Sequence, residues 1–267
     1  MTRLVHLTDL HFGAARSALV APLHHALRAV APDLVIVTGD LSHRGRRHQL
    51  RKAMKFLEAL DMPFIATPGN HDVPLYNLVA RFLFPFWGWR SVVGSETSPP
   101  ATAGPFRIFT ANTADPQSIR RGLLREGDLA KLHAGLAQGP PDMINVLACH
   151  HPLTEPPGFD RGETRGAAAA LPQMAQSGLH VVLTGHLHHW SIGLGVTATE
   201  TRPLLMIQSG TALCARRGEK DHGFAVLEAA EQGLRITPWA VDEAALEYRP
   251  LPGKSFQREA RGWRLRT

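Results

Sequence analysis

The sequence predicts an α/β protein in which helices cover largely buried β-sheets. Short apolar runs of strand length recur along the 267 residues, and segments with helical spacing of their apolar residues lie between them. The chain is long enough for one well-buried domain, and its sequence has no internal repeat and no low-complexity linker. We therefore expect a single domain over residues 1–267.

Nine runs predict strands. Residues 4–8, 34–38, 63–67, 106–110, 144–148 and 181–184 are short, rich in β-branched and other apolar residues, and typical of buried strands. Three later runs, 206–207, 223–227 and 234–237, have a weaker form of the same pattern. Because the runs are apolar on both faces, we expect each sheet to be covered on both sides.

Two segments between the strands predict amphipathic helices. Over residues 48–60 the positions of Leu50, Ala53 and Leu57 follow the i, i+3, i+4 rule, and residues 128–138 repeat the pattern. Turn-forming composition predicts loops over residues 94–104 and 154–166.

The formal net charge of +6 favours anionic partners. The excess is local. Residues 43–55 carry six lysines and arginines without an acid, and a basic C-terminal tail of about residues 249–267 carries six against one acid. Each segment is either solvated surface or a surface that holds an anionic substrate or a membrane. No added DNA-binding module is evident, so we expect no nucleic-acid partner.

The compartment is predicted from features that the sequence lacks. No apolar run is long enough to span a membrane, and the N-terminal residues lack the apolar core and cleavage site of a signal peptide. The two cysteines, Cys149 and Cys214, belong to no CxxC pair and are expected to be small buried residues. These features favour a cytoplasmic protein.

Five of the predicted strands are followed immediately by residues that can bind metal ions. Asp9 and His11 follow the first, Asp40 the second, Asn70, His71 and Asp72 the third, His150 and His151 the fifth, and His186 and His188 the sixth. In α/β sheets, sites form at the carboxyl ends of strands, so these side chains can converge. If the chain stays extended, residues two apart point the same way and can bind one ion.

Seven of these residues form a donor set of carboxylate, amide oxygen and imidazole, without a thiolate. They are Asp9, His11, Asp40, Asn70, His150, His186 and His188. Such donors suit Mn²⁺, Fe²⁺, Co²⁺ or Zn²⁺. Seven ligands are too many for one ion, but two neighbouring ions would use them all if one carboxylate bridged. The pattern does not identify the bridging residue.

The motifs "DLH", "GD", "GNHD", "HHP" and "GHLH", in this order, resemble the signature of the calcineurin-like metallophosphoesterases. The signature runs from Asp9 to His188. Its motif sequences are most similar to those of the branch that contains class III cyclic-nucleotide phosphodiesterases and glycerophosphodiesterases. The resemblance implies a four-layer αββα sandwich of two mixed sheets flanked by helices. It also implies hydrolysis of a phosphodiester by a hydroxide that bridges two divalent ions.

The resemblance assigns a role to each matching residue. One ion is held by Asp9, His11 and His188, the other by Asn70, His150 and His186, and Asp40 bridges the two. His71 would stabilise the transition state or protonate the leaving oxygen, and Asp72 would orient His71.

Several polar residues keep alternative interpretations. His150 and His151 compete for one ligand position; the related pattern H-x-P favours His150, and His151 would then approach the substrate. Arg161 and Arg165 are either phosphate clamps or solvent-facing residues. His189 is expected to be structural or to lie outside the ligand set.

The aromatic stretch "LVARFLFPFWGWR", residues 78–90, has two interpretations. It is either a core or homodimer contact, or an apolar flap that receives an acyl chain or a membrane surface.

Two alternative functions remain. One is cleavage of a lipid-linked nucleotide pyrophosphate at the membrane surface, as in UDP-diacylglucosamine hydrolases, but "GNHD" departs from the "GNRD" of that group. The other is a metal-free scaffold or membrane-surface binding protein without catalysis. Such scaffolds usually lack several ligands, whereas none is missing here.

Overall fold

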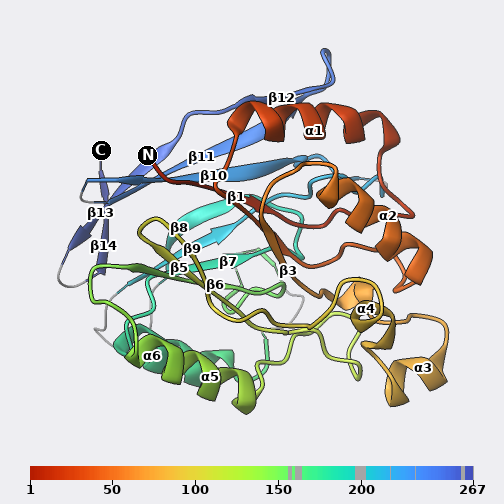
Figure 1. Cartoon of the computed structure of the whole chain (residues 1–267), viewed down its shortest axis with the longest axis horizontal. Helices are drawn as coiled ribbons and strands as arrows, with labels where there is room; N and C mark the ends of the chain where they lie inside the picture. The colour runs from red at the N-terminus through yellow and green to blue at the C-terminus, as the bar shows by residue number, and fades with distance from the viewer. Residues whose placement is uncertain are drawn as a thin grey trace.

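The computed structural model describes residues 1–155, 158–159, 164–195, 203–216, 218–231, 233–259 and 262–266. Two mixed β-sheets pack face to face, and helices cover the outer face of each sheet, as Figure 1 shows. The predicted α/β fold of two mixed sheets with flanking helices is therefore confirmed.

The first sheet has eight strands and takes them from both ends of the chain. They are β1 Arg3–Leu7, β2 Leu34–Thr38, β3 Phe64–Thr67, β10 Gly223–Ala230, β11 Gly233–Asp242, β12 Glu247–Pro250, β13 Lys254–Glu259 and β14 Gly262–Arg266. Their order is β14-β13-β11-β10-β1-β2-β3, with β12 paired to the other end of β11. Strands β1, β2 and β3 are parallel, and β10 is antiparallel to β1.

The second sheet has six strands in the middle of the chain. They are β4 Ala101–Ala103, β5 Phe106–Thr110, β6 Ile144–Ala148, β7 Val181–Thr184, β8 Ser191–Gly195 and β9 Leu204–Gln208. Their order is β4-β5-β6-β7-β9-β8. The four central strands are parallel, and the edge strands β4 and β8 are antiparallel to their neighbours.

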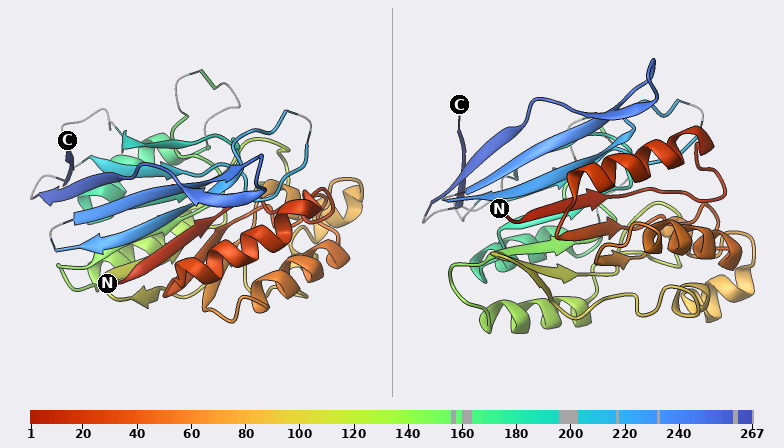
Figure 2. Two further views of the ribbon diagram at one scale, coloured as in Figure 1. Left: turned by 90° about the horizontal axis from the view of Figure 1, so that it is seen from above. Right: turned by 45° about the horizontal axis from the view of Figure 1, so that its top comes forward.

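Helices form the two outer layers. α1 Ser17–Val30 and α2 Arg47–Glu58 cover the first sheet, whereas α5 Glu126–Ala137 and α6 Ala167–Gln176 cover the second (Figures 1 and 2). After β3 come a 3-10 turn, η1 Asn70–Asp72, and two short helices, α3 Leu78–Leu83 and α4 Trp87–Arg90. None of the described helices is long and apolar enough to cross a membrane.

The side chains of β2 show why its sequence is apolar throughout. Val35 and Val37 belong to the core beneath α1 and α2, while Leu34 and Ile36 point the opposite way and join Val146 between the two sheets. A third core lies between the second sheet and the helices α5 and α6. Both faces of a central strand are therefore buried, which requires an unbroken apolar run.

The sequence predicts the central strands of both sheets but misses several helices and edge strands. Strands β2, β5, β6 and β7 have the predicted bounds, but the predicted loop 94–104 is wrong at its end, where β4 forms. The sequence does not predict α1 and α6. Each contains a proline, Pro22 or Pro172, which removes a backbone donor and usually ends a helix. The described part of the basic segment 249–267 contains the end of β12 and all of β13 and β14.

A buried histidine links the two sheets. His6 on β1 is hydrogen-bonded through Nε2 to Thr38 Oγ1 at 2.8 Å and through Nδ1 to Ser209 Oγ, just after β9, at 2.9 Å. Burial lowers the pKa of His6 to about 3, and the nearby Asp9 carboxylate only partly opposes this. His6 is therefore neutral when the protein is folded.

This burial predicts a pH-dependent loss of stability. The unfolded chain protonates His6 near pH 6.5 and the folded chain only near pH 3, so the free energy of unfolding should fall as the pH drops between these values. Urea denaturation in the presence of a chelator should show a steeper fall for the wild type than for His6→Gln, which keeps hydrogen-bonding atoms but does not titrate. Parallel curves would show that His6 is not the responsible group.

Candidate metal centre

The carboxyl ends of five strands meet between the sheets, and the predicted metal ligands lie there together. Asp9 and His11 follow β1, Asp40 follows β2, Asn70 follows β3, His150 follows β6, and His186 and His188 follow β7. Each of the seven residues is at most 8% exposed. Three strands of the first sheet and two of the second therefore contribute to one buried site.

The first cluster joins Asp9, His11, His188 and Asp40. His188 Nε2 lies 2.8 Å from Asp9 Oδ1 and 3.3 Å from His11 Nε2. His11 Nε2 is 3.3 Å from Asp9 Oδ1 and 3.4 Å from Asp40 Oδ2. These four atoms face one another across a space of a few ångströms.

The second cluster joins Asn70, His150 and His186 to the same Asp40. Asn70 Oδ1 lies 3.1 Å from His150 Nε2 and 3.0 Å from His186 Nδ1. His150 Nε2 is 3.4 Å from Asp40 Oδ2. One carboxylate oxygen therefore lies at the same distance from a histidine of each cluster.

Neighbouring groups hold the outward-facing atoms of most of these side chains. Asp9 Oδ2 accepts hydrogen bonds from Thr8 Oγ1 and the His186 amide, and Asp40 Oδ1 accepts one from the His71 amide. Asn70 Nδ2 donates to the Ile119 carbonyl. His150 Nδ1 donates to the Thr38 carbonyl, and His188 Nδ1 donates to Glu219. Outer partners of this kind fix the orientation of metal ligands.

The inward-facing atoms fit a metal centre because hydrogen-bond acceptors of neighbouring side chains point toward one another. His150 donates its Nδ1 proton to a carbonyl, so Nε2 faces the oxygens of Asn70 and Asp40 and has a lone pair for a metal ion whenever the ring is neutral. His188, which donates to Glu219, likewise turns a lone pair toward Asp9. Two atoms bound to one ion at about 2.1 Å lie about 3.0–3.4 Å apart, as most of these do.

The electrostatics of the site also favour positive charge. Burial lowers the pKa of a histidine, but the Asp40 and Asp9 carboxylates and the hydrogen bond to the Thr38 carbonyl together outweigh burial and raise the pKa of His150 to about 9. Burial likewise opposes protonation of His188, whereas Asp9, Cys214 and Glu219 raise its pKa to about 12. Burial would raise the pKa of the Asp9 and Asp40 carboxyls, yet the surrounding histidines hold both below their usual range. Bound cations would supply the positive charge that this site favours.

The backbone is strained at the ligands. Asp9, His11, Asp40, His186 and His188 have positive φ angles between 47° and 71°, and only three other non-glycine residues among those described share this conformation. The left-handed region is unfavourable for residues with a Cβ. The expectation that each pair of ligands two residues apart lies on extended chain is therefore wrong: these ligands lie in tight turns, and His186 and His188 face different clusters.

Two glycines allow these turns to approach the carboxylates. A Cβ at Gly185 would lie 2.6 Å from Asp9 Oδ2 and closer still to Thr8 Oγ1. A Cβ at Gly69 would lie 2.8 Å from Asp40 Cγ. Any side chain at either position would displace one of the clustered carboxylates.

The structure corrects the role expected for Asp72. Its Oδ1 accepts from the amide and hydroxyl of Ser42, and its Oδ2 from the amides of Leu41 and Gly69. Asp72 therefore holds the two turns that follow β2 and β3. The ring of His71 is held instead by the carbonyl of His43, which accepts from His71 Nδ1 at 2.8 Å. The rings of His43 and His71 are stacked.

The remaining predicted residues lie in different surroundings. His151 is buried beside the second cluster, with Nδ1 hydrogen-bonded to Thr113 Oγ1 and its ring against His186. Arg165 is half-exposed and forms an ion pair with Asp115. Arg161 lies outside the described residues. His189 is half-exposed and contacts Asp221 at 3.0 Å, away from both clusters.

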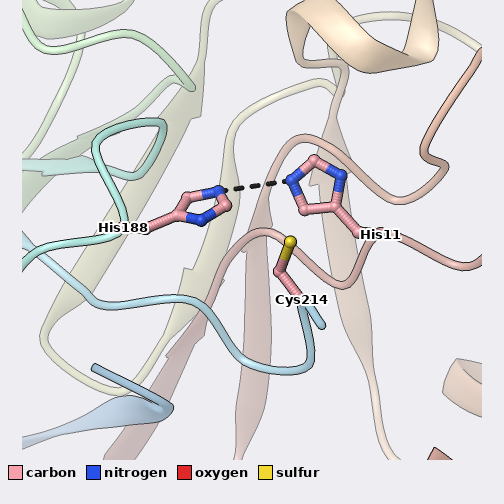
Figure 3. Close-up of side chains that lie close together, drawn as sticks. All are labelled: His11, His188 and Cys214. Carbon is pink, nitrogen blue, oxygen red and sulfur yellow. Dashed lines mark hydrogen bonds between the residues drawn. The ribbon is translucent and has the colours of Figure 1, made fainter. Parts of the chain in front are cut away.

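The loop after β9 contributes residues that the sequence does not predict. The thiol of Cys214 lies beside the rings of His11 and His188, close enough to be a further candidate donor (Figure 3). Glu219 accepts from His188 Nδ1 at 2.8 Å, and Arg216 lies 3.2 Å from the same ring. These residues also follow a strand, so the rule that places chemistry at strand ends would have identified the segment.

Comparisons with known proteins agree with this geometry. The sequence profile of the calcineurin-like phosphoesterases matches residues 2–190. A probable cyclic nucleotide phosphodiesterase of Synechococcus sp. is 29% identical over 209 residues, which cover 73% of this chain and 76% of that protein. Glycerophosphodiester phosphodiesterase GpdQ of Enterobacter lignolyticus is 35% identical over 81 residues, which cover 26% of this chain and 29% of that protein.

A solved structure has the same fold. It is a dimetal phosphatase from Danio rerio, which superposes with a TM-score of 0.67 at 14% identity and covers 97% of this chain and 99% of that chain. The matched profile and the buried aspartate and histidine clusters together indicate a site for two metal ions.

The shared oxygen of Asp40 predicts that both ions depend on one residue. Asp40→Asn should lower the affinity for both ions, by roughly a hundredfold or more, because it removes a buried charge from each cluster. Metal analysis after reconstitution with Mn²⁺ would measure this, with His189→Ala as the control that keeps both ions. An Asp40→Asn protein that binds either ion with unchanged affinity would show that the oxygen is not shared.

The close approach at Gly185 predicts a loss of metal without loss of fold. Gly185→Ala should displace Asp9 and lower the affinity of the first cluster by about ten- to a hundredfold. Gly193→Ala is the matched control, since its added Cβ would meet no atom within 4 Å. Titration with Mn²⁺, with circular dichroism to verify the fold, makes the comparison. Equal affinities for the two variants would contradict the prediction.

Proposed function

Because the chain belongs to the calcineurin-like phosphoesterase family, we propose that it is a phosphodiesterase that hydrolyses its substrate with the aid of two divalent metal ions. The relatives support the choice of a phosphodiester, since they include a probable cyclic nucleotide phosphodiesterase and a glycerophosphodiester phosphodiesterase. The donor set suits Mn²⁺, Fe²⁺, Co²⁺ or Zn²⁺.

One observation carries the proposal: Asp40 Oδ2 lies 3.4 Å from the Nε2 atoms of both His11 and His150. Two clusters that share a carboxylate oxygen would hold their ions side by side. Two neighbouring ions, when bound, neutralise charge on the phosphate and lower the pKa of a water molecule so that it can attack at neutral pH.

The residues of the chain then supply position and proton transfer. Asp9, Asp40 and their hydrogen-bond partners fix the geometry before substrate binds, so little reorganisation is needed during the reaction. His71 donates its Nδ1 proton to the His43 carbonyl, which leaves Nε2 able to exchange a proton with the leaving oxygen. Its ring centroid is 4.8 Å from that of His11, so it lies beside the first cluster.

A second candidate is cleavage of a lipid-linked nucleotide pyrophosphate. The observation in its favour is the group of large apolar side chains exposed on α3, the helix that follows the GNHD turn. A metal-reconstituted panel separates the candidates. The proposed activity requires turnover of bis-p-nitrophenyl phosphate or a cyclic nucleotide, whereas turnover of a nucleotide-linked lipid alone would favour the second. A protein that binds less than one equivalent of metal after reconstitution with Mn²⁺ and hydrolyses none of these would favour the metal-free scaffold.

The position of His71 predicts a defect in turnover rather than in metal binding. His71→Ala should lower kcat for bis-p-nitrophenyl phosphate by about 10²- to 10⁴-fold, with both ions retained, because it removes only the proton donor. His189→Ala should leave kcat and metal content unchanged. If His71→Ala keeps full turnover, another group or water protonates the leaving oxygen.

A further inference from the structure

An apolar surface lies on the segment from Tyr76 to Trp87, a few residues after the GNHD turn. Seven large side chains there are 57–66% exposed, namely Tyr76, Leu78, Val79, Phe82, Leu83, Phe84 and Trp87. Single exposed apolar residues are ordinary in soluble proteins, but a contiguous group marks an interaction site. We call these seven residues the α3 surface.

The α3 surface is built on a fixed base. Arg81, on the same helix, is only 4% exposed, and its guanidinium donates to the carbonyls of Pro74, Pro116 and Ser118. Trp89 is fully buried and donates to the Ser95 carbonyl. The aromatic stretch 78–90 is therefore divided: Trp89 packs in the core, while the α3 surface faces solvent.

Cations border the α3 surface. Arg44, Arg46 and Arg47 line a cavity of about 630 Å³ together with Tyr76 and Trp87. The Arg44 guanidinium lies 5.1 Å from the centre of the Tyr76 ring, and that of Arg47 lies 4.7 Å from the Trp87 ring.

Helix α2 extends this basic border with Arg51, Lys52 and Lys55, all of which are exposed. In the described part of the chain, none of the six cations, Arg44 through Lys55, forms an ion pair with an acidic residue. Their charge is therefore available to a partner.

We infer that the α3 surface and its basic border dock the protein on an anionic lipid bilayer. The apolar side chains would enter the boundary between headgroups and acyl chains, where tryptophan and tyrosine are favoured. The six cations would meet lipid phosphates, and each cation near an anionic membrane adds to the attraction. Neither apolar insertion nor charge alone gives stable attachment, and this surface offers both.

The charge also decides between a bilayer and a second copy of the chain. In a symmetric dimer the same patch is buried on both copies, so the six unpaired cations of each copy would be brought to one interface. An anionic bilayer neutralises them instead. The bilayer is therefore the occupant that matches both the apolar and the charged part of the surface.

Docking would bring lipid headgroups close to the metal centre. Arg44 directly follows His43, whose carbonyl holds His71. The inference concerns binding and does not require the proposed phosphodiesterase activity. The basic strands β13 and β14 are not part of the surface, since they lie at the opposite end of the molecule from α3 (Figures 1 and 2).

The experiment is vesicle sedimentation of the whole chain. We expect the wild type to pellet with vesicles of phosphatidylcholine and phosphatidylglycerol, but not with phosphatidylcholine alone. Binding should weaken at high salt and persist in a chelator, since it does not use the metal ions. Binding that disappears with the chelator, or that does not distinguish the two vesicles, would overturn the inference.

Two pairs of variants locate the surface. Two double variants should each lower vesicle binding about tenfold or more. One combines Phe82→Ser with Leu83→Ser, and the other combines Arg44→Glu with Arg46→Glu. Leu265→Ser and Arg266→Glu on β14 are matched controls, being exposed residues of the same types at the far end, and should bind like the wild type. Circular dichroism verifies that each variant folds.

Sedimentation equilibrium tests the rival occupant. If the surface binds a bilayer, the wild type and the double variant with Phe82→Ser and Leu83→Ser should have the same oligomeric state without lipid. A wild-type dimer that this double variant converts to a monomer, without vesicle binding by the wild type, would assign the surface to a second copy of the chain and refute membrane docking.

Discussion

The rest of this structure depends on one constraint: several acceptor atoms lie close together around Asp40. Carboxylate oxygens, an amide oxygen and imidazole nitrogens from two sheets point at one another with few protons between them. Without positive charge, either protons on His150 and His188 or metal ions, these atoms repel one another. Two cations, if bound, would link the two sheets at their carboxyl ends. The sandwich architecture therefore matters for the site because it places Asp40 of one sheet 3.4 Å from His150 of the other.

The same constraint explains why the turns that carry the ligands are strained. A non-glycine residue in the left-handed region costs about 1–2 kcal/mol, and most such residues of the described chain are ligands at this site. The strain is tolerated because outer partners fix each turn. The carboxylate of Asp72, for example, accepts hydrogen bonds from the turns after both β2 and β3. Stability and ligand geometry are thus opposed at these turns.

Patterns in the sequence predict the central strands and all seven clustered donors, because a buried strand and the polar residue that follows it both leave local signals. They do not predict α1 or α6, since a proline such as Pro22 argues against a helix locally and only tertiary packing overrides it. They also miss Glu219 and the true partner of His71. Those contacts join loops far apart in the sequence, and the partner of His71 is a backbone carbonyl, which no residue type reveals.

The placement of β1 has a consequence for synthesis on the ribosome. Leu4 pairs with Leu34 on one side and with Leu227 on the other. The first three strands can associate soon after they emerge, but one edge of β1 stays open until β10, residues 223–230, has been translated. Contacts so distant in sequence slow folding, and an open apolar edge invites aggregation while it lasts. Nascent chains of this protein should therefore depend on chaperones until β10 closes that edge.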